Sequence, residues 1–201
     1  LKVFLKKTLA VLCLFVLLLS VFPPSFVFAE EEAEEEIVFK HLLGNDAVRK
    51  PSQAGALQLV EYNGKLTLAG EDGEPVQLRG MSTHGLHWFG EIVNENAFAA
   101  LSNDWECNVI RLAMYVGEYG YATDPSVKDL VYKGIELAFE NDMYVIVDWH
   151  VHAPGDPRAE VYSGAYDFFE ELADYYKDHE KFHYIIWELA NEPSSNSSGG
   201  P

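Results

Sequence analysis

Two apolar runs flank an amphipathic segment in the middle of the chain: VIRLA at residues 109–113, SVKDLVYKGIELAFEN at 126–141 and YVIVDW at 144–149. The short apolar runs are typical of buried strands. In the middle segment, apolar residues recur at the i, i+3, i+4, i+7 spacing of one helix face. A strand, a helix and a second strand in this order form a βαβ unit, whose two strands run parallel. These residues therefore predict an α/β fold built on a parallel sheet.

The same alternation of strands and helices continues on both sides of this unit. The further elements that the pattern predicts are a strand over Val76–Met81, a helix over Asn94–Trp105, a helix over Gly164–Asp178 and a strand over Tyr184–Ala190. Before them, Asn63-Gly64 separates two alternating apolar segments, which is the strongest short-range sign of a β-hairpin. We therefore expect a hairpin followed by four strand-helix repeats.

Two parallel architectures fit this pattern, an open doubly wound sheet and a closed eightfold barrel. The first strand-helix turn, GMSTHG at residues 80–85, lacks the G-x-G-x-x-G pattern of a dinucleotide site, so we expect no such cofactor. Polar and aromatic residues follow the predicted strands, where a TIM barrel carries its active site. They are His84, His87, Trp88, Arg111, Tyr115, Asp148, His150, His152, Asn191 and Glu192. We therefore predict a (β/α)8 TIM barrel.

Chain length bears on how much of that barrel is present. A complete barrel takes about 250 residues, and this chain of 201 residues contains about four βα units before a Ser- and Gly-rich stretch at 194–200. We expect residues 56–201 to be the amino-terminal half of a catalytic barrel.

The beginning of the chain has a different composition. Lysines at positions 2, 6 and 7 precede an apolar run over Leu9–Leu19, and small residues stand before Glu30, as in a cleavable secretory signal. The run is shorter than the ~20 residues of a membrane span. Six acids then occur within residues 30–36, a charge run that favours disorder. We expect a signal peptide over 1–29 and an acidic, disordered leader over 30–55, hence a secreted, extracellular bacterial protein.

The overall charge excludes one class of partner. The chain has 14 Lys+Arg against 32 Asp+Glu, a formal net charge of -18. Because neutralising phosphates supplies most non-specific affinity for nucleic acids, so acidic a chain is not expected to bind them.

The motif Asn191-Glu192-Pro193 carries the chemistry that we expect at the barrel mouth. It follows the apolar run YIIW at 184–187. Apolar and aromatic neighbours disfavour the charged form of a carboxyl, so Glu192 could protonate a leaving oxygen. Taken alone, a glutamate at a strand end is more often an ordinary surface carboxylate. Glu188 shares the strand parity of Glu192 but lies roughly 13 Å deeper, and we interpret it as structural.

Four ordered motifs together resemble glycoside hydrolase family 5, and most of all the bacterial endo-β-1,4-glucanases such as the alkaline cellulases of bacilli. The motifs are LRGMSTHGLHWFG at 78–90, VIRLAMY at 109–115, VIVDWH at 145–150 and WELANEP at 187–193. The resemblance covers residues from about 56 to the end. It implies a barrel that hydrolyses β-1,4-glucan with retention of configuration, and it gives Glu192 the role of general acid/base, with Asn191 on the sugar 2-hydroxyl.

A retaining mechanism needs a second carboxylate about 5–5.5 Å from the first. The family places this nucleophile at the end of the seventh barrel strand, beyond Pro201, so no residue of this chain is assigned to it and the chain alone is expected to be inactive. Arg111 would hold that nucleophile ionised by its permanent charge. The alternative for Arg111 is a structural ion pair at a strand end.

The resemblance also implies a set of substrate-binding residues. His150 matches a family histidine in the substrate cleft, His84 and Trp88 match residues lining the glycone subsites, and Tyr115 matches a tyrosine in the same cleft. The Trp88 ring would stack on a sugar face. Phe89 stands where close relatives often carry Tyr, which keeps the packing and loses one hydroxyl.

Other functions remain open at this point. His150-Val151-His152 with His84 and His87 could bind a metal, as in metal-dependent TIM-barrel hydrolases. The protein could instead be a catalytically silent glucan-binding protein, or another family 5 β-glycanase such as a mannanase or lichenase. The preferred expectation is a monomer that acts on β-1,4-glucan, with no cofactor, no metal and no membrane association after signal cleavage.

Overall fold

The computed structural model describes residues 45–194. The predicted signal peptide, the part of the predicted leader up to residue 44 and residues 195–201 lie outside this range. Within residues 45–194, no helix has the length and apolar character needed to cross a membrane.

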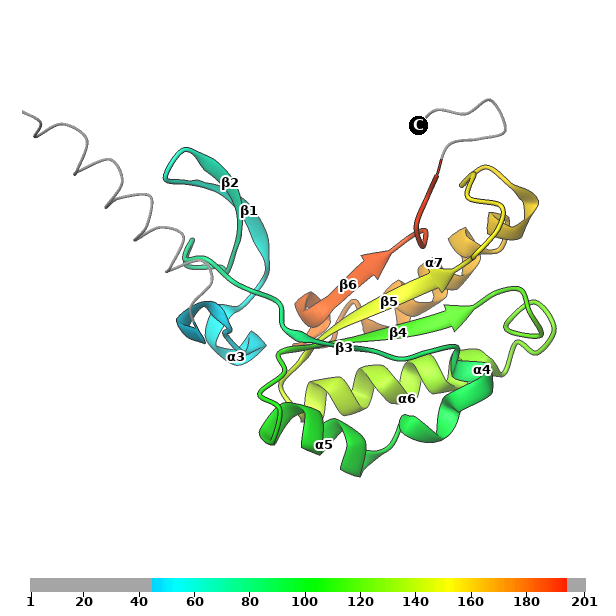
Figure 1. Ribbon diagram of the computed structural model, residues 1–201, viewed down its shortest axis with the longest axis horizontal. Helices are drawn as coiled ribbons and strands as arrows, with labels where there is room; N and C mark the ends of the chain where they lie inside the picture. The colour runs from blue at the N-terminus through cyan, green and yellow to red at the C-terminus, as the bar shows by residue number, and fades with distance from the viewer. Residues whose placement is uncertain (1–44, 195–201) are drawn as a thin grey trace, which may run out of the picture. The chain divides into compact units, whose positions relative to one another are not determined.

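A parallel four-stranded sheet forms the centre of the fold. Its order is β3 (Gly80–Ser82), β4 (Val109–Tyr115), β5 (Tyr144–His150) and β6 (Ile185–Glu188), and each neighbouring pair is parallel. Figure 1 shows β4, β5 and β6 side by side and pointing the same way. The predicted parallel α/β architecture is confirmed.

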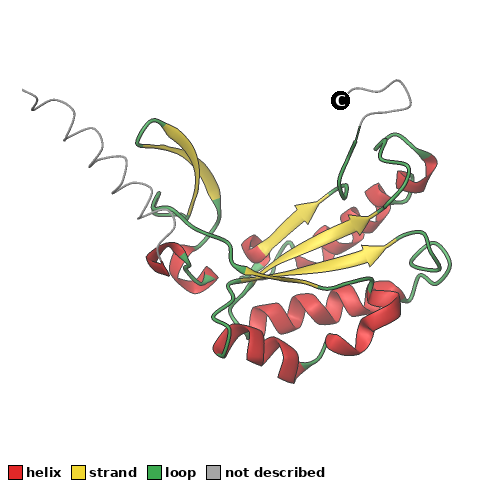
Figure 2. Cartoon of the chain, viewed as in Figure 1, coloured by secondary structure: helices red, strands yellow, loops and turns green. Residues whose placement is uncertain are grey.

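Three longer helices connect the strands: α5 (Glu95–Asn103), α6 (Val127–Glu140) and α7 (Ala165–Tyr176) (Figure 2). The Asn94 side chain caps α5 by accepting a 3.0 Å hydrogen bond from the Ala97 amide. Shorter turns complete the described elements: η1 (Asn45–Ala47), α3 (Pro51–Ala54), α4 (Leu86–Phe89), η2 (Gly90–Ile92), η3 (Glu160–Tyr162) and η4 (Phe182–Tyr184).

The predicted hairpin is also present. Strands β1 (Gln58–Tyr62) and β2 (Lys65–Ala69) pair antiparallel on either side of Asn63 and Gly64. Both turn residues have positive φ, 49° and 74°, as a two-residue turn of the hairpin type requires.

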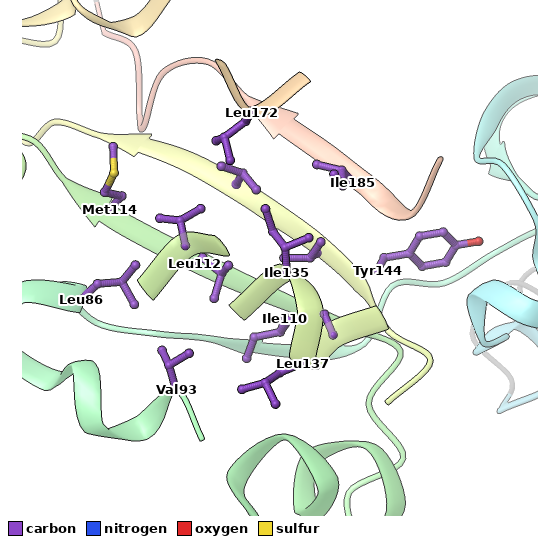
Figure 3. Close-up of a cluster of buried hydrophobic side chains, with 14 of the residues drawn as sticks. Leu86, Val93, Ile110, Leu112, Met114, Ile135, Leu137, Tyr144, Leu172 and Ile185 are labelled. Carbon is purple, nitrogen blue, oxygen red and sulfur yellow. The ribbon is translucent and has the colours of Figure 1, made fainter. Parts of the chain in front are cut away.

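Strand alternation separates a packed face of the sheet from a polar one. Ile110, Leu112 and Met114 of β4 are buried in the apolar core with Ile135 of α6, and Figure 3 shows these side chains in one cluster. The alternate β4 residues must point to the opposite face. That face therefore carries Arg111 and the other polar side chains of the predicted site.

The first predicted strand is wrong over residues 76–79, because only Gly80–Ser82 pair in the sheet. The backbone before Gly80 has other partners. The Val76 amide donates to Leu68 in the hairpin, and the Gln77 amide donates to Ala47. The Asn108 side chain accepts from the Arg79 amide at 2.7 Å and donates to the Gln77 carbonyl at 2.9 Å. Residues 76–79 thus hydrogen-bond to the hairpin, to Ala47 and to the buried Asn108 side chain instead of continuing the pairing of β3 with β4.

The predicted disordered leader is wrong for residues 45–55. These residues form η1 and α3, and Ala47 and Ala54 are buried. Lys50 is the anchor: its ammonium group donates to the Ser102 carbonyl and hydroxyl and to the Cys107 carbonyl, at 2.6–3.2 Å.

The Lys50 contacts lie at the end of the sheet where the strands begin. We call this end the floor, and we call the opposite end, where the strands finish, the rim.

Candidate active site

Arg111 is the centre of the polar network at the rim. Its Nε donates to Glu188 Oε2 at 2.7 Å, and its Nη2 donates to Glu188 Oε1 at 2.9 Å. Nη2 also lies 2.8 Å from Asp148 Oδ2. Although burial opposes its charge, the hydrogen bonds and charges of Glu188 and Asp148 leave the pKa of Arg111 above its ordinary value. The guanidinium therefore stays charged and fixed in direction.

Asn191 is held by the same guanidinium. Its Oδ1 accepts from Arg111 Nη2 at 2.9 Å, and its Nδ2 donates to the Val151 carbonyl at 3.3 Å. Because a guanidinium only donates, the amide orientation of Asn191 is determined. One Nδ2 hydrogen is left over, as hydrogen bonding to a sugar hydroxyl would require.

Asp148 and His150 form a buried pair on β5. The Asp148 side chain is 0% exposed, and its Oδ2 lies 2.6 Å from His150 Nδ1. Burial raises the pKa of Asp148, and the His150 hydrogen bond and the Arg111 charge offset only part of that rise. An aspartate at Nδ1 fixes the ring orientation of His150. Its Nε2 is buried and has no hydrogen-bond partner within residues 45–194.

Aromatic rings stand beside this polar network. Tyr115 stacks on His150 with ring centroids 4.0 Å apart and on His84 at 5.6 Å. Trp88 lies 5.2 Å from Tyr115 and is partly exposed, and Phe89 meets His84 edge-on at 5.5 Å. The predicted aromatic substrate-binding residues are thus brought together in one cluster beside His150, in which Trp88 and Phe89 are exposed and Tyr115 is buried.

Glu192 occupies a different environment from the one expected. It follows β6, the last strand of the described sheet, and its side chain is exposed, without the apolar enclosure that the sequence suggested. The reason is that no strand within residues 45–194 pairs with the far edge of β6. Its backbone φ is 40°, a conformation that costs a non-glycine residue about 1 kcal/mol or more and that clusters at functional sites.

Comparison with protein families agrees with this arrangement. Residues 69–200 match the model of the cellulase family, glycosyl hydrolase family 5, over more than half of the chain. The chain belongs to glycosyl hydrolase family 5. The motifs quoted for that resemblance, and the parallel sheet that carries them, are therefore explained by common descent.

Individual family 5 relatives are similar over most of this chain. An endoglucanase of Bacillus sp. (strain KSM-635) is 81% identical over 161 residues, which are 80% of this chain and 17% of the relative. An endoglucanase of Halalkalibacter akibai is 61% identical over 97% of this chain and 24% of its own length. The chain thus spans about a quarter or less of these two curated relatives.

Solved structures give the same family and fold. The catalytic domain of alkaline cellulase K is 83% identical with a TM-score of 0.73, covering 78% of this chain and 44% of that domain. An endoglucanase catalytic domain of Thermobifida fusca, solved in complex with cellotetraose, is 38% identical with a TM-score of 0.66, covering 74% of this chain and 47% of that chain. The described residues therefore correspond to less than half of a family 5 barrel.

The histidines proposed as an alternative metal site have other partners in this family 5 chain. His150 pairs with Asp148, and His152 Nδ1 lies 2.8 Å from Glu118 Oε1. His87 Nε2 lies 3.0 Å from the Glu118 carbonyl. No group of three or more His, Cys, Asp or Glu residues within 45–194 is arranged to hold a metal ion.

Sequence reasoning missed two contributors to the family 5 site. Asp148 was expected at a strand end but was given no role, although its place two residues before His150 puts both side chains on one face of β5. Glu118 lies in the loop after β4 and shows no periodicity that could have connected it with His152. Glu188 was expected deeper than the rim, but it is the last residue of β6 and accepts two hydrogen bonds from Arg111, so it belongs to the rim network.

Proposed function

We propose that the full-length protein is an endo-β-1,4-glucanase that cleaves internal bonds of β-1,4-glucan with retention of configuration. The observation that carries the proposal is the rim cluster of a family 5 chain. Arg111 donates a hydrogen bond to Asn191, the residue before Glu192, and Asp148 holds His150. The aromatic rings of Trp88 and Tyr115 lie close together in the same rim cluster.

Each group has a role that its chemistry supports. Glu192 donates its proton to the glycosidic oxygen as the bond from C1 to that oxygen breaks. A carboxylate supplied by the polypeptide beyond Pro201 attacks C1 and forms the glycosyl-enzyme. Glu192 then removes a proton from the water that attacks C1 and releases the sugar, which is the two-step course of a retaining glycosidase.

The rim residues prepare this reaction. Arg111 Nη1 donates only a 3.3 Å hydrogen bond to the Ser82 hydroxyl. Arg111 can therefore stabilise the charge of the nucleophile while its other nitrogens stay bound to Glu188. Asn191 offers its remaining amide hydrogen to the sugar. His150 Nε2, which lacks a partner among residues 45–194, is a candidate hydrogen-bonding group for a sugar hydroxyl, and the exposed Trp88 side chain can stack on a sugar face.

The test is Glu192→Gln in the full-length protein, assayed by release of reducing ends from soluble carboxymethyl cellulose. Loss of the proton donor should lower kcat by roughly 10²–10⁴-fold, while glucan binding is retained. Glu140→Gln, an exposed glutamate at the end of α6, is the matched control and should keep full activity. Undiminished hydrolysis by Glu192→Gln would refute the proposal, and a wild-type protein that binds glucan without cleaving it would favour a non-catalytic binding protein.

The preferred glycan is proposed to be cellulose-type β-1,4-glucan, because the relatives described above are named endoglucanases or cellulases. Initial rates of the full-length protein on carboxymethyl cellulose, lichenan and mannan at equal concentration test this choice. A higher kcat/KM on mannan would reassign it to another β-glycanase activity.

We further propose that the protein is exported, with cleavage after Ala29, and acts outside the cell as a monomer. The observation that supports export is the composition of residues 1–29. Amino-terminal sequencing of the protein from culture medium should begin at Glu30. Light scattering during gel filtration should give the mass of one chain, and a dimer mass would refute the second part.

A further inference from the structure

Two residues outside the motifs form a chain of hydrogen bonds that ends on Tyr115. Glu118 Oε1 lies 2.8 Å from His152 Nδ1, and His152 Nε2 lies 3.2 Å from the Tyr115 hydroxyl. Glu118 belongs to the loop after β4, and His152 follows β5. The loops after β4 and β5 are therefore connected by the Glu118–His152 hydrogen bond, which continues through His152 to Tyr115 at the end of β4.

The order of these contacts determines where each hydrogen lies. An ionised carboxylate only accepts, so the His152 nitrogen facing Glu118 must carry its hydrogen. In a neutral imidazole the other nitrogen, Nε2, is then an acceptor. The Tyr115 hydroxyl must therefore donate to His152. Burial raises the pKa of Tyr115 and the charge of Glu118 raises it further, so the phenol keeps the hydrogen that it donates.

The Tyr115 ring itself has little freedom to turn. It is stacked on His150 at 4.0 Å with an interplanar angle of 14°, and its exposed fraction is 6%. His152 meets it edge-on at 4.9 Å. With the ring fixed, rotation of the hydroxyl hydrogen is the remaining variable, and that hydrogen decides whether Tyr115 offers a sugar a donor or an acceptor.

We propose that Glu118 and His152 are positioning residues that commit the Tyr115 hydrogen to His152, so that Tyr115 meets a sugar hydroxyl as a hydrogen-bond acceptor. The inference rests on the proposed function, because it concerns substrate binding in the same cleft. It assigns to His152 a role other than metal binding and to Glu118 a role in setting the tautomer of His152.

A double-mutant cycle in the full-length protein tests this. Tyr115→Phe removes the acceptor and should raise KM for soluble β-1,4-glucan roughly fivefold, the effect of one hydrogen bond, with kcat changed by less than twofold. His152→Phe leaves the hydroxyl undirected and should raise KM by a similar factor. The double variant should be no worse than Tyr115→Phe alone, because His152 acts only through the hydroxyl.

Two further variants separate positioning from packing. His152→Gln supplies an amide oxygen that can accept from Tyr115, so its KM should lie close to the wild-type value and well below that of His152→Phe. Glu118→Gln can either accept from or donate to the imidazole, so control of the tautomer weakens and KM should rise by a smaller factor. Additive effects of Tyr115→Phe and His152→Phe, or a kcat loss without a KM change, would overturn the inference.

A measurement independent of activity addresses the same point. Nitrogen NMR of the histidine side chains in the folded full-length protein, at a pH where the neutral forms prevail, should show His152 protonated at Nδ1 and bare at Nε2. The opposite tautomer would overturn the inference even if hydrolysis is normal. A full-length protein that cleaves no glucan, yet shows the expected tautomer, would instead refute the proposed function.

Discussion

The floor and the rim of the sheet differ in whether their buried polar side-chain atoms have hydrogen-bond partners. At the floor, the fully buried Asn108 makes three hydrogen bonds to backbone groups. At the rim, Asp148 Oδ1 and His150 Nε2 are buried and lack a partner within residues 45–194. The described residues contain five such unpartnered side-chain atoms, and three belong to the rim residues His87, Asp148 and His150.

This difference separates stability from binding. A buried polar group without a partner costs about 1–3 kcal/mol, so the three unpartnered atoms at the rim lower the stability of the fold more than the single one near the floor, Gln77 Oε1. In TIM barrels the strand carboxyl ends carry the active site, and the opposite end serves stability. The contrast therefore predicts large unfolding effects for floor substitutions and small ones at the rim, where activity should suffer instead.

The largest loss of stability is expected for Asn108→Ala. It leaves the backbone groups of Arg49, Gln77 and Arg79 without their partner in a buried place. The free energy of unfolding should fall by about 3–5 kcal/mol, measured by urea unfolding of the full-length protein. Asn103→Ala, at an exposed position near the end of α5, is the control and should change it by less than about 0.5 kcal/mol.

Lys50→Met should have the next largest effect. Methionine fills a similar volume but leaves the Ser102 and Cys107 carbonyls without the ammonium donor. We expect a loss of about 2 kcal/mol, seen as a lower urea midpoint with unchanged KM for glucan. Lys65→Met on the exposed hairpin is the matched control. Equal losses for the two lysines would contradict the anchoring role of the floor.

Tyr144→Phe tests the floor through its pH dependence. The Tyr144 hydroxyl donates to the Gly55 carbonyl at 2.6 Å, and burial raises its pKa from 10.0 to about 12. Because the pKa is higher in the folded state, the phenol stabilises that state fully below pH 10, and the contribution is lost as the pH rises towards 12.

The variant should lose about 1 kcal/mol at neutral pH, and the difference from wild type should shrink between about pH 10 and 12. Urea unfolding at a series of pH values measures this difference. Tyr119→Phe, at a side chain that is 81% exposed, should show no such trend. A difference that grows with pH would have the wrong sign and would contradict the argument.

The sequence predicted the fold best where burial repeats regularly. The strand predicted over 109–113 is β4, extended to Tyr115, and the helix predicted over 126–141 is α6 with one residue fewer at each end. The predictions for residues 45–55 and 76–79 were wrong because the structure of these segments depends on hydrogen bonds with distant parts of the chain. Lys50 donates to Ser102 and Cys107, and Asn108 bonds the backbone of residues 77 and 79. Such tertiary bonds leave no periodic pattern in a sequence.

The candidate site was likewise predictable from the sequence only in part. Arg111, His150 and Asn191 could be placed together because parallel strands bring their carboxyl ends to one edge. The partners that orient them could be predicted only in part, since Asp148 shares a strand with His150 whereas Glu118 lies in a loop. The expected enclosure of Glu192 failed because it depends on neighbours that residues 45–194 do not supply. The catalytic roles themselves remain predictions.

The smallest change in stability is expected at the rim, for Asp148→Asn. Burial raises the pKa of Asp148 above its ordinary 3.8, so ionising this group costs the folded state free energy, and stability that is fully present below about pH 3.8 is lost as the pH rises through the higher folded-state pKa. Asparagine removes this cost together with the attraction to Arg111, which keeps Glu188 as a partner. The two changes oppose each other, and the free energy of unfolding at pH 7 should move by less than about 1 kcal/mol.

Hydrolysis by Asp148→Asn should nevertheless fall by about tenfold or more, because His150 loses the carboxylate that fixes its ring. Parallel urea unfolding and kcat measurements on the full-length protein separate the two effects, with Asp129→Asn on the exposed face of α6 as control. If Asp148→Asn unfolded as easily as Asn108→Ala, the rim would stabilise the fold as much as the floor does. In that case the unpartnered atoms at the rim could not be taken as a sign of ligand binding.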